Sequence, residues 1–247
     1  AGGEPVMTPA GGGARWRYWA RSGWIAAAPE VLEPPALLRR RRRVALLTLV
    51  VGALVLAWTL RLEPGSPAFY GGTLALACVW ALGAMLSGPL HLGRMPSGTG
   101  QGARPVWSAL VVGVALLALF LLGALLVARI PLLREPVDAL LAHARYGSLP
   151  LVALLTALNG VAEEVFFRGA LYAASPLRYA VPLTTVVYAA VTAGAGVPLL
   201  VFAALVLGVV TALQRRATGG ILAPCLTHLV WSLGMLFLLP PLLSLAS

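Results

Sequence analysis

Residues 106–128 read VWSALVVGVALLALFLLGALLVA and contain no charged side chain. An α-helix needs about 20 apolar residues to cross the hydrocarbon core of a bilayer, so this stretch predicts a transmembrane helix. We place six further apolar stretches at 44–60, 68–90, 148–171, 179–193, 197–213 and 219–242. The sequence therefore predicts an all-α fold, a polytopic membrane helix bundle with about seven transmembrane helices.

The composition of the whole chain agrees with this prediction. Of its 247 residues, 60% are hydrophobic and 11% are charged, whereas a soluble domain carries about 25% charged residues. This deficit excludes a soluble enzyme, a disordered regulator and a nucleic-acid-binding module. Cys78 and Cys225 both fall inside apolar stretches and indicate no disulfide framework.

Three parts of the chain differ in character. Residues 1–43 form a basic segment that we expect to be partly disordered at its Gly-rich start. Within it, residues 14–38 suit either a helix on the membrane surface or a flexible tail. Residues 44–147 hold three transmembrane helices, followed by an outer loop at 129–147 whose apolar spacing suits a short amphipathic helix. Residues 148–247 hold a core of about four helices.

The fifth and sixth stretches are shorter than a full span. We expect them to be tilted, partly re-entrant or joined as a tight hairpin, because Gly194, Gly196 and Pro198 mark a turn between them.

Every basic residue other than the three histidines is an arginine, and the arginines lie mainly between the apolar stretches. With a cytoplasmic N-terminus, fourteen arginines fall on the cytoplasmic side (15, 17, 21, 39–43, 94, 104, 168, 178, 215 and 216) and four on the outside (61, 129, 134 and 145). This asymmetry predicts a cytoplasmic N-terminus and an outer C-terminus. The exclusive use of arginine is typical of a GC-rich bacterium, so we expect the cell (inner) membrane.

Only two of the eight acidic residues, Glu163 and Glu164, lie inside an apolar stretch. Each carboxylate costs about 2.5–3.5 kcal/mol at the centre of a transmembrane helix, so an adjacent pair indicates a function. Glu164 and Arg168 are four residues apart and can pair. Glu163 lies about 100° around the helix, on the face of Asn159, and is free to act as a general base or acid. The alternative is an ion cluster at the inner helix end, which leaves Glu163 unexplained.

His228 is the ionisable group of the last apolar stretch and shares a helix face with Cys225 and Ser232. By itself, it would be interpreted as a neutral histidine bonded to a neighbouring helix. Counting about 1.5 Å per residue places His228 and Glu163 at similar depths in the inner half of the bilayer. A shared site is therefore geometrically possible.

At these positions the sequence resembles the CPBP family of CAAX proteases and bacteriocin-processing enzymes. Residues 163–168, EEVFFR, match the EExxxR motif of that family, and residues 227–232, THLVWS, resemble its HxxxN/D motif. Residues 188–192, YAAVT, stand where the family carries FxxxH. The resemblance covers roughly residues 148–240.

The resemblance implies an intramembrane endopeptidase. Such an enzyme would use a glutamate-activated water to hydrolyse a peptide bond near the membrane-embedded end of a protein or peptide. The resemblance assigns Glu163 as general base, Glu164 and Arg168 as its structural partners, and His228 as the group that stabilises the oxyanion. The expected partners are a membrane-anchored substrate and the lipid bilayer, with no nucleic acid.

Two positions depart from the family pattern. Thr192 replaces the histidine of the middle motif and Ser232 replaces the asparagine of the last one. Threonine cannot take a proton from water near neutral pH, and losing a general-base partner costs about 10²–10⁴ in rate. Catalysis is then weakened, moved to a Glu163–His228 pair or absent. Asn159 and Tyr188 are the remaining candidates for supporting roles.

Some relatives are described as metalloproteases. One usable histidine and two carboxylates are a poor ligand set for catalytic zinc, so we expect no tightly held metal and no other cofactor.

Other functions stay open. Bacterial relatives include immunity proteins and myxosortases, and a prenylated substrate is not expected in a bacterium. The main alternative is a non-catalytic membrane chaperone, regulator or immunity protein. A small transporter with a carboxylate relay would need two matching halves, which this sequence lacks.

Overall fold

The computed structural model describes residues 33–63, 65–95, 102–127 and 148–246. In order, the helices are α2 (Pro35–Thr59), α3 (Pro67–Ser87), α4 (Val106–Val127), α6 (Leu149–Glu164), the π-helix η2 (Val165–Leu171), α7 (Tyr172–Ala174), α8 (Leu177–Ala193), α9 (Pro198–Thr218) and α10 (Leu222–Ala246). Because α6, η2 and α7 continue one another, these described ranges form seven rods. The predicted all-α polytopic bundle is confirmed.

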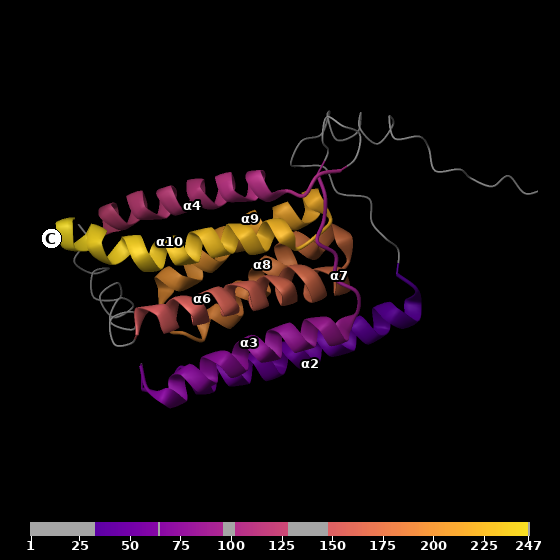
Figure 1. The fold of residues 1–247 in the computed structure, drawn as a ribbon. Helices are drawn as coiled ribbons and strands as arrows, with labels where there is room; N and C mark the ends of the chain where they lie inside the picture. Colours follow the sequence, from indigo (N-terminus) through magenta and orange to yellow (C-terminus); the bar gives the residue numbers. More distant parts are fainter. Residues whose placement is uncertain (1–32, 64, 96–101, 128–147, 247) are drawn as a thin grey trace, which may run out of the picture.

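Successive rods run in opposite directions along the bundle (Figure 1). Six of them are long and apolar enough to cross a membrane, and α8 is a shorter apolar helix. Large apolar side chains remain exposed on the outer faces, for example Leu47, Trp107 and Leu122. Such a surface suits lipid rather than water, so the chain is a multi-pass membrane protein.

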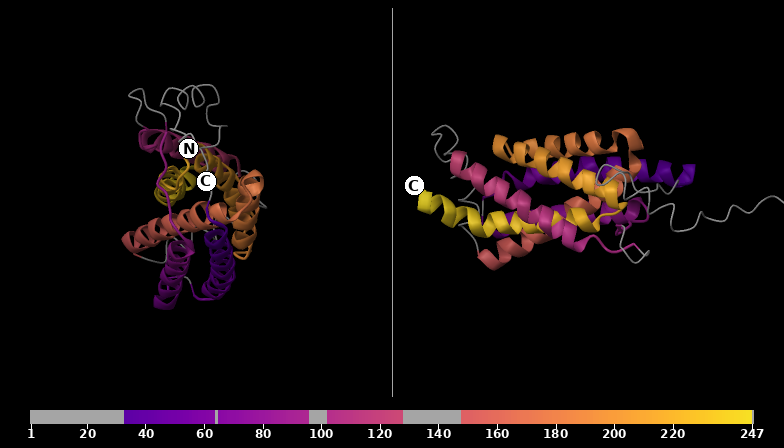
Figure 2. Two further views of the ribbon diagram at one scale, coloured as in Figure 1. Left: turned by 90° about the vertical axis from the view of Figure 1, so that its right-hand side faces the viewer. Right: turned by 90° about the horizontal axis from the view of Figure 1, so that it is seen from above.

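The long helix of α6 and η2 lies between two helix pairs. The α2–α3 hairpin packs on one of its sides and the α4–α10 pair on the opposite side, while α8 and α9 pack against each other (Figure 2). The residues of the EEVFFR stretch are therefore contacted from several directions.

Two helices are longer than predicted. α2 begins at Pro35 and includes the arginine run that we expected to precede a helix starting at 44. Proline suits the first turn of a helix and arginine is a good helix former, which explains the early start. α9 continues to Thr218, beyond the predicted end at 213, and stops where Gly219 adopts a left-handed conformation with φ 71°. The sixth stretch is thus a full-length helix, whereas α8 stays short.

Arg41 explains how a charged residue of the run tolerates burial. Its side chain is fully buried and forms an ion pair with Glu33. It also donates to Ser87 Oγ at 3.2 Å and to the carbonyl oxygen of Pro89 at 3.1 Å. Arg41 therefore fastens the start of α2 to the end of α3.

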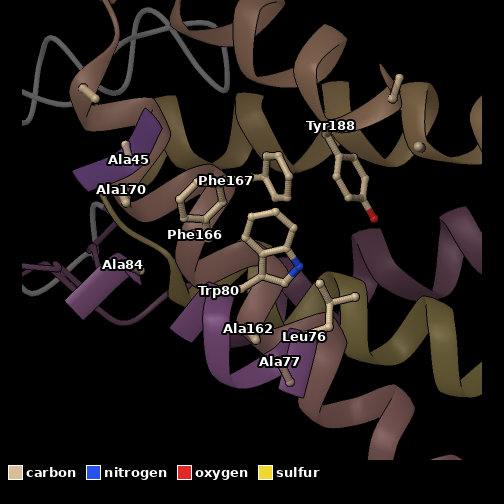
Figure 3. Packing of buried hydrophobic residues seen from close by; sticks show 13 residues of the cluster. Ala45, Leu76, Ala77, Trp80, Ala84, Ala162, Phe166, Phe167, Ala170 and Tyr188 are labelled. Carbon is tan, nitrogen blue, oxygen red and sulfur yellow. The ribbon is translucent and has the colours of Figure 1, made fainter. Parts of the chain in front are cut away.

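The core of the bundle is aromatic where α3 meets η2 (Figure 3). The ring of Trp80 stacks on Phe166 with 4.7 Å between centroids and lies 5.3 Å from Phe167. A Cβ atom on Gly52 would lie 2.1 Å from the Trp80 ring, so Trp80 occupies the space that this glycine leaves on α2. The α2–α3 hairpin is thereby joined to the EEVFFR stretch.

Predictions for residues 1–32, and for the loop at 129–147 that contains His143, lie outside the described residues.

Candidate active site

The two glutamates lie where an α-helix passes into a π-helix. α6 ends at Glu164, and the next seven residues, Val165–Leu171, form η2. π-Helical turns are rare and occur often at functional sites. The five residues 166–170 of η2 are all buried, so Arg168 points into the bundle and not toward lipid.

Glu164 is fully buried and shares one oxygen between two partners. Its Oε1 lies 3.2 Å from Arg168 Nη1 in an ion pair, and 2.9 Å from His228 Nδ1. The expected Glu164–Arg168 pairing is thus present. A buried carboxylate needs such compensation, because an unpaired charge is very costly in an apolar interior.

Arg168 is held by two other helices. Its Nη2 donates to the carbonyl oxygen of Gly208 on α9 at 3.2 Å, and its guanidinium lies 4.9 Å from the ring centroid of Tyr188 on α8. Arg215 Nε in turn donates to the carbonyl oxygen of Arg168 at 2.8 Å. A Cβ atom on Gly208 would lie only 3.3 Å from Arg168 Nη2, so the glycine makes room for this contact.

Glu163 lies outside this ion cluster. Its Oε2 accepts a hydrogen bond from the Tyr188 hydroxyl at 2.7 Å. Among the described residues, Glu163 forms no ion pair within 4.0 Å, and its Oε1 has no hydrogen-bond partner. Glu163 is partly exposed, whereas Glu164 is completely buried. Two adjacent carboxylates in different surroundings can perform different tasks.

His228 of α10 reaches the site over Gly160 of α6. A Cβ atom on Gly160 would lie 3.4 Å from His228 Cδ2, so the ring rests on a position without a side chain. Because Nδ1 bonds to Glu164, the ring is oriented and only Nε2 is left for other partners. The direct carboxylate partner of His228 is therefore Glu164, and not the Glu163 that one of the alternatives from the sequence paired with it.

Three residues predicted to support the site have no hydrogen bond to Glu163, Glu164 or His228 among the described residues. Thr192 donates to the carbonyl oxygen of Tyr188 on its own helix at 2.9 Å. Asn159 Nδ2 donates to the carbonyl oxygen of Thr73 on α3 at 3.2 Å, so the amide joins α6 to α3. Ser232 Oγ is buried and has no hydrogen-bond partner among the described residues.

Sequence reasoning missed a polar chain directly beside His228. Gln214 Nε2 donates to Thr227 Oγ1 at 2.7 Å, and this hydroxyl donates to the carbonyl oxygen of Ala109 at 3.0 Å. The chain ties α9, α10 and α4 together at the level of the histidine. A signal was present, since Thr211, Gln214 and Thr218 recur at helical spacing near the end of α9.

Within the part of the chain that the structure describes, no group of three His, Cys, Asp or Glu side chains is placed to hold a metal ion. Glu164 Oε1 and His228 Nδ1 bond to each other, and Glu163 Oε2 accepts from Tyr188. One histidine and two carboxylates, one of which is already bound to Arg168 and His228, are a poor donor set and do not fit a catalytic zinc site.

Comparison with protein families found a match in the second half of the chain. Residues 145–234 match the model of the family described as type II CAAX prenyl endopeptidase Rce1-like. The matched range contains both glutamates, Arg168, Tyr188 and His228. Comparisons with curated proteins and with solved structures gave no match. The resemblance to CAAX-type proteases that the sequence predicted is confirmed over residues 145–234.

Proposed function

From the family match over residues 145–234 and the geometry of the two carboxylates, we propose that this chain is an intramembrane endopeptidase. It hydrolyses a peptide bond near the membrane-embedded end of an anchored protein or peptide. The observation that carries the proposal is that, among the described residues, Glu163 forms no ion pair within 4.0 Å and keeps one oxygen without a hydrogen bond. Such a carboxylate can accept a proton from water.

The other residues then have distinct tasks. Glu163 Oε1 removes a proton from water, and the resulting hydroxide attacks the carbonyl carbon of the substrate. The same proton later passes from Glu163 to the leaving nitrogen. His228 Nε2 is the nitrogen that the bond to Glu164 leaves available, and when protonated it donates to the oxyanion of the tetrahedral intermediate.

Arg168 and Ser232 complete this arrangement. Arg168 compensates the charge of Glu164, which allows the carboxylate to remain buried beside the histidine. The Ser232 hydroxyl lies one helical turn beyond His228 and is free to supply a second donor. The substrate segment has to unwind at the site, because the amides of a helix are shielded by their own hydrogen bonds.

The test compares E163Q with E63Q in cells that express the full chain, with labelling of new protein N-termini in membrane fractions. Glu63 is exposed at the end of the bundle opposite the arginine run, so E63Q is a matched control. Some new N-termini should appear only in cells that express the wild-type chain, and we expect the same N-termini with E63Q. With E163Q their rate of formation falls by about 10²–10⁴-fold. Equal processing by E163Q and wild type would remove the proposal.

A second candidate function is supported by Thr192. Its hydroxyl bonds to its own helix, so no described group at position 192 assists the activation of water. A non-catalytic chaperone, regulator or immunity protein would keep the fold and tolerate this change. In that case E163Q preserves the cellular function, whereas a bulky G208V, which would displace Arg168, abolishes it.

A further inference from the structure

Tyr188 occupies an unusual position relative to Glu163. Its hydroxyl donates to Glu163 Oε2 at 2.7 Å, and among the described residues no other group donates to this carboxylate. The residue is 8% exposed, although it belongs to an apolar helix that faces lipid on its outer side. A buried phenol generally requires a hydrogen-bond partner, and here that partner is the proposed catalytic base.

The ring of Tyr188 is fixed from two sides. Phe167 of η2 meets it edge to face with 4.9 Å between centroids (Figure 3). The Arg168 guanidinium lies 4.9 Å from its centroid. Phe167 also lies 5.3 Å from Trp80. The hydroxyl oxygen is therefore held at the end of a packed row of aromatic rings and has little freedom to move away from Glu163.

Position 192 lies one helical turn from Tyr188 on the same face of α8. The Thr192 hydroxyl donates to the carbonyl oxygen of Tyr188, so it offers no proton to Glu163. The described part of α8 thus contacts Glu163 through the side chain at 188 and not through the one at 192.

We infer that Tyr188 is a positioning residue for Glu163 and takes the place of the partner that position 192 lacks. The inference rests on the proposed function. The hydroxyl fixes Oε2 through a charge-assisted hydrogen bond, which turns Oε1 toward the attacking water. During the reaction the transferred proton moves from water to Oε1 and then to the leaving nitrogen. The Tyr188 hydroxyl keeps its own proton throughout.

The kinetic test uses Y188F, with Y179F as the matched control. Both variants remove one hydroxyl from α8, but Tyr179 is exposed and forms a cation–π contact only with its neighbour Arg178. The substrate is the segment identified by N-terminal labelling, supplied as a peptide to the full chain in lipid nanodiscs. We expect Y188F to lower kcat about 10- to 100-fold, with KM unchanged, because a lost hydrogen bond to a charged group has this effect. Y179F should match wild type, and an unchanged kcat in Y188F would overturn the inference.

A second measurement needs no substrate. Infrared difference spectra between wild type and E163Q identify the carboxyl band of Glu163. Removing the Tyr188 hydroxyl should shift this band, whereas Y179F should leave it in place. A band that stays unshifted in Y188F would overturn the inference.

The two measurements separate this inference from the proposed function. If the Glu163 band shifts in Y188F but the wild type does not turn over the peptide, the proposed function is overturned, and with it the role of Tyr188 in catalysis. Equal turnover by wild type and Y188F would overturn the role of Tyr188 alone.

Discussion

Glu163 and Glu164 are adjacent and chemically identical, yet their surroundings differ. Glu164 is completely buried and is compensated by Arg168 and His228. Glu163 is partly exposed, and among the described residues its side chain is hydrogen-bonded only to the Tyr188 hydroxyl. At the scale of single residues, one carboxylate therefore stabilises the site and the other is left to react.

The stabilising role can be tested with R168M. This change leaves the buried Glu164 carboxylate without its cation, and removing one partner of a buried pair costs about 3–5 kcal/mol. Arg178 is exposed and stacks on Tyr179, so R178M should cost less than about 1 kcal/mol. Unfolding of both variants in detergent measures the difference. If R168M is as stable as R178M, Arg168 is not the compensating charge.

At the scale of helices, close packing depends on small residues facing larger ones. Cβ atoms on Gly83 and on Gly234 would clash with Thr48 and with Leu117 respectively, so the α2–α3 and α4–α10 pairs approach closely at these points. This pattern is typical of membrane helices, where packing and not burial from water drives association. Gly52 of α2 likewise leaves space for Trp80 of α3, and the Trp80 ring stacks on Phe166 of η2.

G52A tests whether the α2–α3 hairpin supports the site. The added Cβ atom would lie 2.1 Å from the Trp80 ring, so the ring must leave its present stacked position on Phe166. Overpacking of this kind costs about 1–3 kcal/mol, and we expect lower thermal stability together with slower processing. G71A is the control, because nothing lies within 4 Å of a Cβ atom at that position. A G52A protein that behaves like G71A would contradict this coupling.

At the scale of the whole molecule, charge is distributed very unevenly between the two ends. One end, where α2 begins and α3 ends, carries ten of the described arginines (Arg39, Arg40, Arg41, Arg42, Arg43, Arg94, Arg104, Arg178, Arg215 and Arg216) (Figure 1). Among the described residues at the opposite end, Arg61 is accompanied by Glu63. The arginine-rich end is predicted to be cytoplasmic.

Reporter fusions test this orientation in bacterial cells. Alkaline phosphatase fused after Arg94, at the arginine-rich end, should be inactive, and green fluorescent protein at that position should fluoresce. At the C-terminus the two results should be reversed, since α10 ends on the opposite side of the bundle (Figure 1). Active phosphatase after Arg94 would invert the predicted topology.

The sequence alone determined the class of the fold and the residues worth examining. Seven apolar stretches predict seven helices because a bilayer imposes a minimum length on any helix that crosses it. Glu163, Glu164 and His228 were recognisable because ionisable groups are costly in apolar stretches. The Glu164–Arg168 pair also followed from the sequence, since residues four apart share a helix face.

Only the tertiary structure decided which of these groups meet. His228 and Glu164 are 64 residues apart, and Tyr188 and Glu163 are 25 apart, so helical periodicity relates neither pair. His228 bonds to Glu164 and not to Glu163 because of the way in which α6 and η2 face α8 and α10. Similarly, the burial of Arg41 depends on Glu33 and on the end of α3. Packing between helices sets these contacts, and a single sequence records the period of each helix but not the angle at which it meets its neighbours.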